Sequence, residues 1–215
     1  MLEIKNIYKT FNPGTINEKV ALNGLSLKLN EGDFVTVIGG NGAGKSTMLN
    51  AVAGVWPVDE GQILIDGTDV TKLSEYKRAA YLGRVFQDPM TGTAATMGIE
   101  ENLALAKRRG KARVLRPGIT KAERAEYQEL LKILDLGLED RLTSKVGLLS
   151  GGQRQALTLL MATLQKPKLL LLDEHTAALD PKTASKVLTI TDKIVNRDHL
   201  TTLMITHNMK DAIAH

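Results

Sequence analysis

The stretch of this chain that most restricts its fold is Gly39 to Thr47, which reads GGNGAGKST. An apolar, β-branched run, Phe34 to Ile38, precedes it, and an apolar run of helical length, Met48 to Val55, follows it. Between a strand and a helix, backbone N–H groups and the helix dipole converge on one point and attract phosphate. The stretch therefore predicts a phosphate-binding P-loop. The alternative is a glycine-rich turn that matches the pattern by chance.

Each residue type in this loop has an expected role. Glycines allow the backbone to curl so that several N–H groups face one place. Lys45 is expected to reach the terminal phosphates of a nucleotide, and the Ser46 hydroxyl is expected to ligate Mg²⁺. The residues predicted to bind the nucleotide are Gly39, Gly40, Asn41, Gly42, Ala43, Gly44, Lys45, Ser46 and Thr47.

The rest of the chain predicts an α/β fold. Strand patterns occupy Leu2 to Tyr8, Val20 to Leu29, Gln62 to Ile65, Tyr81 to Phe86, Leu169 to Leu172 and Leu200 to Thr206. Helical patterns occupy Ile99 to Lys107, Ala122 to Leu134, Gln153 to Leu164, a helix starting at Pro181 and a helix over Asn208 to Ala214. We expect one P-loop NTPase domain over residues 1–215. Its core (1–90 and 165–215) combines a mostly parallel sheet with an N-terminal antiparallel β part, and a helical subdomain (about 91–164) is inserted.

Several predicted strands end at polar residues of catalytic type. Gln87 follows one strand, Asp173 and Glu174 follow the run of leucines, and His207 follows the last strand. In open parallel sheets, ligands bind beyond the carboxyl ends of the strands, so these residues are expected to meet the P-loop at one edge.

Phosphoryl transfer to water suggests a role for each of these residues. Asp173 would hold Mg²⁺, Glu174 would act as general base, Gln87 would bridge metal and water, and His207 would bond the γ-phosphate and the attacking water. The structural alternatives are a solvated turn at Asp173 and Glu174, a surface turn at Gln87, and a structural histidine at His207.

The pentapeptide LSGGQ, Leu149 to Gln153, opens another predicted helix. A serine and two glycines at a helix N-terminus favour anion binding. Since the P-loop already holds the phosphates, we expect this site to close over ATP bound to a second copy, giving a two-fold, head-to-tail homodimer. The residues predicted to bind ATP in trans are Ser150, Gly151, Gly152 and Gln153; an ordinary N-cap is the alternative.

Taken together, these motifs resemble the nucleotide-binding domain of an ABC transporter, in the family's order and over nearly the whole chain. The set is GGNGAGKST, Gln87, LSGGQ, LLLLDE at 169–174, AALD at 177–180 and His207. The resemblance implies ATP and Mg²⁺ as cofactors, dimer closure on ATP binding, and reopening on hydrolysis. It also implies that Phe11 stacks on adenine, unless it belongs to the core, and that Asp180 lies in a loop crossing the dimer.

The chain departs from the family pattern at three places. Gly40 replaces a proline that is often found there, which should loosen the loop without removing donors. His175 replaces the proline that commonly follows the glutamate. The sequence also stops shortly after His207, earlier than is typical of the family.

The length and the charge pattern of the chain favour a transporter ATPase over the ABC ATPases that act on nucleic acid. There is one P-loop, and Gln87 to Leu149 is too short for a coiled-coil arm. A basic stretch, Lys107 to Arg116, has no interleaved aromatic residue on which bases could stack, so no nucleic-acid partner is expected. Two other hypotheses are a cytosolic ABC ATPase acting on nucleic acid or ribosomes, and a nucleotide-gated binding module that does not hydrolyse ATP.

Composition is ordinary for a globular protein, with 43% apolar and 24% charged residues, a net charge of +4 and no cysteine. No apolar run approaches the roughly 20 residues that cross a bilayer. We therefore expect separate permease subunits. The resemblance implies a bacterial importer for a small solute such as an amino acid. The chain would sit peripherally on the cytoplasmic face of the inner membrane, with an extracytoplasmic solute-binding protein in the same system.

Overall fold

The computed structural model describes residues 1–111 and 118–207. Its chain forms two compact units, which are described in turn. The first comprises Met1–Gly83, Pro167–Glu174 and the C-terminal segment from His199, and the second comprises Arg84–Lys166 and His175–Asp198. The predicted helix over Asn208 to Ala214 lies outside the described residues.

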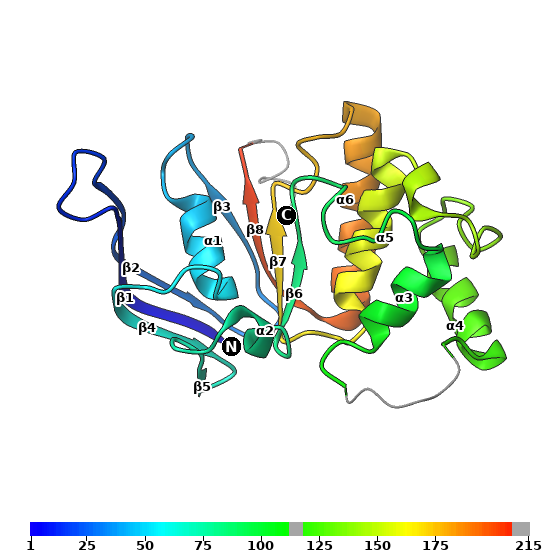
Figure 1. Ribbon diagram of the computed structural model, residues 1–215, viewed down its shortest axis with the longest axis horizontal. Helices are drawn as coiled ribbons and strands as arrows, with labels where there is room; N and C mark the ends of the chain where they lie inside the picture. Colours follow the sequence, from blue (N-terminus) through cyan, green and yellow to red (C-terminus); the bar gives the residue numbers. More distant parts are fainter. Residues whose placement is uncertain (112–117, 208–215) are drawn as a thin grey trace. The chain divides into compact units, whose positions relative to one another are not determined.

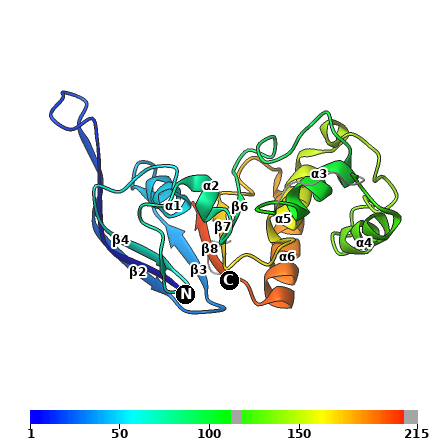
Figure 2. The ribbon, with the colours of Figure 1, turned by 60° about the horizontal axis from the view of Figure 1, so that its bottom comes forward.

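The N-terminal part of the first unit is an antiparallel sheet with the order β2-β1-β4-β5. Its strands are β1 (Leu2–Phe11), β2 (Lys19–Leu29), β4 (Glu60–Ile65) and β5 (Thr68–Asp69). Strand β1 runs further than predicted because Lys9, Thr10 and Phe11 still pair with β2. The hairpin between β1 and β2 extends beyond the rest of this sheet (Figure 2).

The other sheet has the order β3-β8-β7-β6, and the pairs β3·β8 and β7·β8 are parallel. Its strands are β3 (Phe34–Ile38), β8 (Thr201–Thr206), β7 (Leu169–Asp173) and β6 (Leu82–Val85). All of β8 and the four leucines of β7 are buried, as expected for parallel strands covered on both faces. The antiparallel and parallel sheets together confirm the predicted α/β fold class.

Helix α1 (Lys45–Ala53) lies between these two sheets, where Met48, Leu49 and Val52 join one core with apolar residues of both sheets (Figure 1). The helix ends at Gly54, whose φ of 84° is the left-handed conformation that favours glycine at a helix C-terminus. Burial of this helix fixes the P-loop at its N-terminus to the sheets.

Arg78, at the end of the short helix α2 (Glu75–Arg78), is 2% exposed and satisfies the other end of α1. One guanidinium nitrogen donates to the carbonyl oxygens of Ala51 and Val52, at 2.6 and 2.9 Å. The others donate to the carbonyls of Leu73 and Thr71. Burial lowers the pKa of the guanidinium, and these carbonyls compensate its desolvation. Neither α2 nor this role was predicted.

The second unit is helical (Figure 1). Its elements are α3 (Ile99–Lys107), α4 (Lys121–Lys132), a 3₁₀ turn (Val146–Leu148), α5 (Gly151–Thr163) and α6 (Pro181–Asp198). Helix α5 is buried along most of its length and contacts α3, α4 and α6. Within residues 1–111 and 118–207, none of the helices combines the length and the apolarity that a bilayer crossing requires.

Candidate functional site

In the first unit, three parallel strands end together. Ile38, the last residue of β3, pairs with Thr206, the last residue of β8. Asp173, the last residue of β7, pairs with Ile205. The P-loop, the pair Asp173–Glu174 and His207 therefore all leave the sheet at the same edge, which is where ligands of parallel sheets bind.

The P-loop has the backbone of an anion cradle. Gly42 and Gly44 have φ values of 82° and 84°, and a Cβ on Gly44 would lie 2.5 Å from the carbonyl oxygen of Ala21. Gly44 is the N-cap of α1 and, lacking a side chain, offers no hydrogen bond to the first N–H groups of the helix. This arrangement suits a phosphate at the helix N-terminus.

Lys45 turns back over this loop. Its ammonium donates to the carbonyl oxygens of Gly39 and Gly40, at 2.7 and 3.1 Å, and the residue is 8% exposed. The charge is therefore held within the loop by its own backbone. Ser46, the next residue, is exposed in the first turn of α1.

Glu174 and His207 are in contact. His207 Nδ1 lies 3.3 Å from Glu174 Oε2, with side-chain exposures of 57% and 15%. Glu174 has a φ of 45°, and its N–H donates to the Ile205 carbonyl at 3.0 Å. A glutamate in the left-handed region costs free energy, and such strain is concentrated at functional sites.

The oxygen donors at this edge suit magnesium. Asp173 is half-buried at the end of β7, and Ser46 offers a hydroxyl at the start of α1. Among the described residues, no three His, Cys, Asp or Glu side chains are grouped so that they could hold a metal ion. Mg²⁺ commonly takes one or two protein ligands and completes its shell with phosphates and water, so this donor set fits a nucleotide-bound ion.

Phe11 stands at the end of β1 and is half-buried. Its ring meets that of Trp56 edge-to-face, with centroids 4.9 Å apart and an interplanar angle of 81°. The Lys9 ammonium lies 5.7 Å from the centre of the Phe11 ring and pairs with Asp59 at 2.8 Å. This surface has the aromatic character that a purine needs, and its predicted stacking on adenine stays a prediction.

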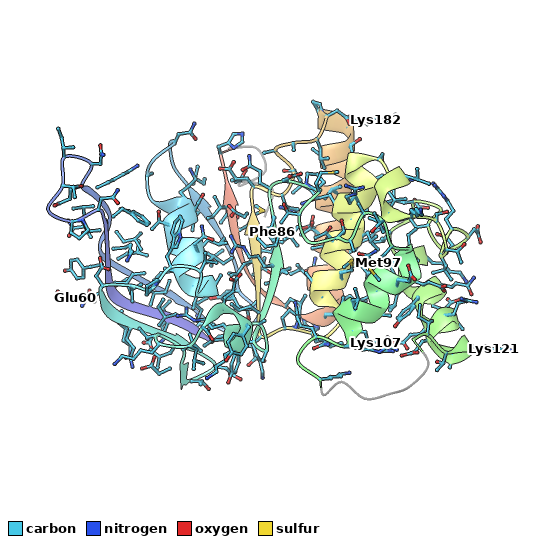
Figure 3. All side chains as sticks on the ribbon, in the orientation of Figure 1. Glu60, Phe86, Met97, Lys107, Lys121 and Lys182 are labelled. Atoms are coloured by element: carbon cyan, nitrogen blue, oxygen red, sulfur yellow. The ribbon has the colours of Figure 1, made fainter. Side chains whose placement is uncertain are left out.

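Gln87 belongs to the second unit, where it is exposed in the turn that follows β6. Phe86, the residue before it, is labelled in Figure 3. The Asp88 carboxylate accepts a hydrogen bond from the N–H of Met90 at 2.8 Å, which fixes this turn. The predicted role of Gln87 beside the metal stays a prediction.

The pentapeptide LSGGQ at the start of α5, called the signature turn below, is capped by two reciprocal hydrogen bonds. Ser150 Oγ accepts from the N–H of Gln153 at 3.3 Å, and Gln153 Oε1 accepts from the N–H of Ser150 at 3.1 Å. Asp180 caps α6, because its carboxylate accepts from the N–H of Thr183 at 3.1 Å. Ser150 and Gln153 thus have a structural role besides the one predicted in trans.

Gly152 permits close packing of α5 on α6. A Cβ at this position would lie 2.1 Å from Thr183 Cγ2, a distance no pair of carbon atoms tolerates. A pocket of about 480 Å³ opens beside this turn within the second unit. Its lining includes Ser150, Gly152, Gln153, Lys182, Thr183 and Lys186.

Sequence reasoning missed two buried polar residues that follow LSGGQ. Gln155 is 0% exposed, and its amide donates to the Phe86 carbonyl at 2.9 Å. Arg154 is 2% exposed; it donates to the Val146 carbonyl at 2.9 Å and contacts the sulfur of Met90. Helix α5 therefore supports both the turn containing Gln87 and the turn before Ser150. Two large polar side chains directly before the mostly apolar part of the helix were the available signal.

His175, which departs from the family pattern, is 1% exposed. Its Nε2 lies 3.1 Å from the hydroxyl of Thr191 in α6, and that hydroxyl donates to the Val187 carbonyl at 2.9 Å. The histidine therefore anchors the segment that follows the predicted general base to α6.

Two residues of the basic stretch form ion pairs with α4. Lys107 pairs with Glu126, and Arg108 pairs with Glu123 at 3.0 Å. Burial lowers the pKa of the Arg109 guanidinium. The remaining members of the stretch are Lys111, which is exposed, and Arg113 and Arg116, which lie outside the described residues. The two ion pairs favour a structural role for Lys107 and Arg108.

The chain is similar to known proteins over most of its length. The family profile described as ABC transporter matches residues 22–177. The tyrosine transport ATP-binding protein of Clostridioides difficile (strain R20291) is 48% identical over 218 residues, covering 99% of this chain and 84% of that protein. The methionine import ATP-binding protein MetN of Rhizobium etli is 39% identical over 194 residues, covering 88% of this chain and 51% of that protein. The chain thus spans about half the length of this second relative.

Among solved structures, the chain is similar to the dimeric post-hydrolysis state of the ATP-binding cassette MJ0796 bound to ADP and Pi. The TM-score is 0.82 at 31% sequence identity, and the match covers 99% of this chain and 90% of that chain. The ADP conformation of the cassette MJ1267 gives a TM-score of 0.80 at 27% identity, covering 100% and 84% of the two chains.

Proposed function

The chain belongs to the ABC transporter family as an ATP-binding subunit, and from this premise we propose that it hydrolyses ATP where β3, β7 and β8 end. The observation that carries the proposal is the shared register of these strands, which brings the P-loop, Asp173, Glu174 and His207 to one edge. The family as a whole uses ATP, normally with Mg²⁺.

In this proposal the loop Gly39–Thr47 binds the phosphates and Lys45 exchanges its two carbonyl partners for phosphate oxygens. Ser46, Asp173 and Gln87 would hold Mg²⁺, which when bound neutralises charge on the phosphates. Glu174 accepts the proton of the attacking water. His207 positions that water and donates to the γ-phosphate.

The proposed dimer uses the signature turn in trans. Ser150, Gly151, Gly152 and Gln153 of one copy close over ATP held by the other, Asp180 lies in the loop that crosses the interface, and Phe11 stacks on the adenine. The dimeric state of the similar cassette supports this arrangement. The whole of 1–215 then acts as one ABC ATPase domain, with 1–90 and 165–215 as its core and about 91–164 as its helical subdomain.

We further propose that the protein powers import of a small solute, such as an amino acid, through separate permease subunits on the cytoplasmic face of the inner membrane. An extracytoplasmic binding protein would deliver the solute. Support comes from the names of the relatives, which include tyrosine transport and methionine import ATP-binding proteins. The solute is expected to touch the permease and not this subunit.

Phosphate release from Mg-ATP tests the enzymatic part of the proposal. Wild-type protein should hydrolyse ATP, and Lys45→Ala should lose nucleotide affinity, because the P-loop then has no cation. Unchanged binding by Lys45→Ala would refute the assigned site. Hydrolysis stimulated by DNA or RNA, without a membrane partner, would instead favour the nucleic-acid hypothesis. Uptake of labelled amino acids by vesicles containing the protein and its permease tests the transport part.

A further inference from the structure

We propose that Lys19 is a second nucleotide-binding cation, which contacts the phosphates of a nucleotide held by the P-loop. The inference rests on the proposed ATP site and adds a residue to it. Lys19 opens β2, and its side chain is exposed. Its ammonium nitrogen lies 3.9 Å from the point where a Cβ on Gly42 would stand. The charge is therefore beside the middle of the phosphate-binding loop.

The packing of β2 on the loop fixes this position. A Cβ on Gly44 would lie 2.5 Å from the Ala21 carbonyl and 3.4 Å from Leu22 Cδ2. Residues immediately after Lys19 thus lie in direct contact with the end of the loop. The start of β2 cannot move away from the P-loop without losing this contact, so the backbone of Lys19 is held beside the loop.

The charge of Lys19 is unpaired within the part of the chain that the structure describes. Its side chain makes no hydrogen bond or ion pair with any residue in 1–111 or 118–207. The nearby loop also carries positive potential, since its N–H groups and the dipole of α1 point the same way. An unpaired ammonium beside such a loop repels it, and an anion between the two converts this repulsion into attraction. A nucleotide polyphosphate is the anion that the loop suits.

Lys19 is also the cross-strand partner of Phe11. The two residues face each other at the end of the β1–β2 hairpin, one offering an aromatic ring and the other an ammonium group. A nucleotide has a base and a phosphate chain joined by a ribose, so a facing ring and cation match both ends of one ligand. We infer that this pair selects nucleotides with a polyphosphate chain, while Lys45 binds the terminal phosphates.

Calorimetric titration with ADP and ATP tests the inference on the full chain. Lys19→Gln should weaken binding about fivefold at low salt, the effect of one exposed charge pair, and the deficit should shrink as salt screens the charge. Lys19→Arg should restore affinity because it keeps the charge. Lys28→Gln, the same change near the other end of β2, should bind like wild type. Melting temperatures check that the exposed substitutions leave the fold intact.

Wild-type affinity of Lys19→Gln at low salt, with Lys45→Ala impaired, would overturn the inference and leave the proposed ATP site standing. If Lys45→Ala also binds normally, the proposed site is wrong and the inference fails with it. An equal loss in Lys28→Gln would overturn the inference as well, because the effect would then come from net charge rather than from position.

Discussion

The imidazole of His207 and the carboxylate of Glu174 lie 3.3 Å apart at the edge of the parallel sheet, at the ends of neighbouring strands. Their backbones are also tied, since the N–H of Glu174 donates to the carbonyl of Ile205 in β8. The position of the proposed general base is therefore set by the strand that carries the histidine.

The first prediction concerns Glu174→Gln. Removing the proposed base should lower ATP hydrolysis about 10²- to 10⁴-fold while nucleotide binding persists. ATP should then trap a dimer that size-exclusion chromatography can detect. Glu31→Gln, an exposed position before β3, is the matched control and should hydrolyse ATP at the wild-type rate. Wild-type turnover by Glu174→Gln would exclude it as the base.

His207→Ala should slow hydrolysis, because the histidine is proposed to position the attacking water and also contacts the carboxylate of Glu174. We expect a loss of about tenfold in kcat, the effect of one hydrogen bond to a charged group, with little change in KM. If the histidine works through Glu174, the double variant should be no slower than Glu174→Gln alone. Steady-state rates of wild type, the two single variants and the double variant form a double-mutant cycle that measures this coupling. Losses that simply add would show that the two residues act independently.

Gly152→Ala should destabilise the fold of the single chain, independently of the proposed dimer. The added Cβ would overlap Thr183 Cγ2, and overpacking of this kind typically costs about 1–3 kcal/mol. Urea unfolding measures the loss. Thr183→Ser removes the clashing methyl and should restore most of the stability in the double variant, whereas Gly118→Ala, with nothing nearby, should be neutral. Full stability of Gly152→Ala would show that α5 and α6 separate easily.

Gln155→Leu should lower the free energy of unfolding, because it leaves a buried carbonyl without its hydrogen-bond donor. The buried amide is replaced by an apolar group of similar size, so the Phe86 carbonyl loses its donor at a cost of about 1–3 kcal/mol. The free energy of unfolding gives the value. Gln128→Leu on the exposed side of α4, where the amide reaches only a carbonyl 3.5 Å away, serves for comparison. Equal losses in both variants would contradict a specific role for Gln155.

Asp180→Ala should lower stability in a pH-dependent way. Hydrogen bonds from the side chain and N–H of Thr183 hold the pKa of the Asp180 carboxyl below its ordinary value of 3.8. A depressed pKa stabilises the fold at any pH above the unfolded value, and this contribution disappears as pH falls through the folded value. The Tm difference from wild type should therefore be full at pH 7 and shrink below about pH 4. A constant difference down to pH 3 would contradict the capping role.

The sequence predicted what depends on local pattern. Phe34–Ile38 and Ile99–Lys107 have the bounds that their apolar periodicity indicated, and the buried run Leu169–Leu172 is a parallel strand. The common edge for the P-loop, Asp173 and His207 also follows from sequence, because parallel strands align their carboxyl ends. The catalytic roles of these residues stay predictions.

What the sequence could not predict depends on partners distant along the chain. Arg78 and Gln155 look like solvent-facing residues of helices, yet each is buried because backbone carbonyls far away in sequence accept its hydrogen bonds. Gly152 looks like part of an anion site, yet its lack of a side chain also serves helix packing. Lys19 has no motif of its own, and only the packing of β2 on the P-loop brings it to Gly42.

The contact between Phe11 and Trp56 has a practical consequence. Trp56 is the single tryptophan of the chain, so all indole emission originates beside the surface proposed for the adenine. A purine that stacks on Phe11 changes the polarity around that indole. Nucleotide binding can therefore be followed by the intrinsic fluorescence of the unlabelled protein. Replacing Phe11 with leucine should abolish the fluorescence change on nucleotide binding.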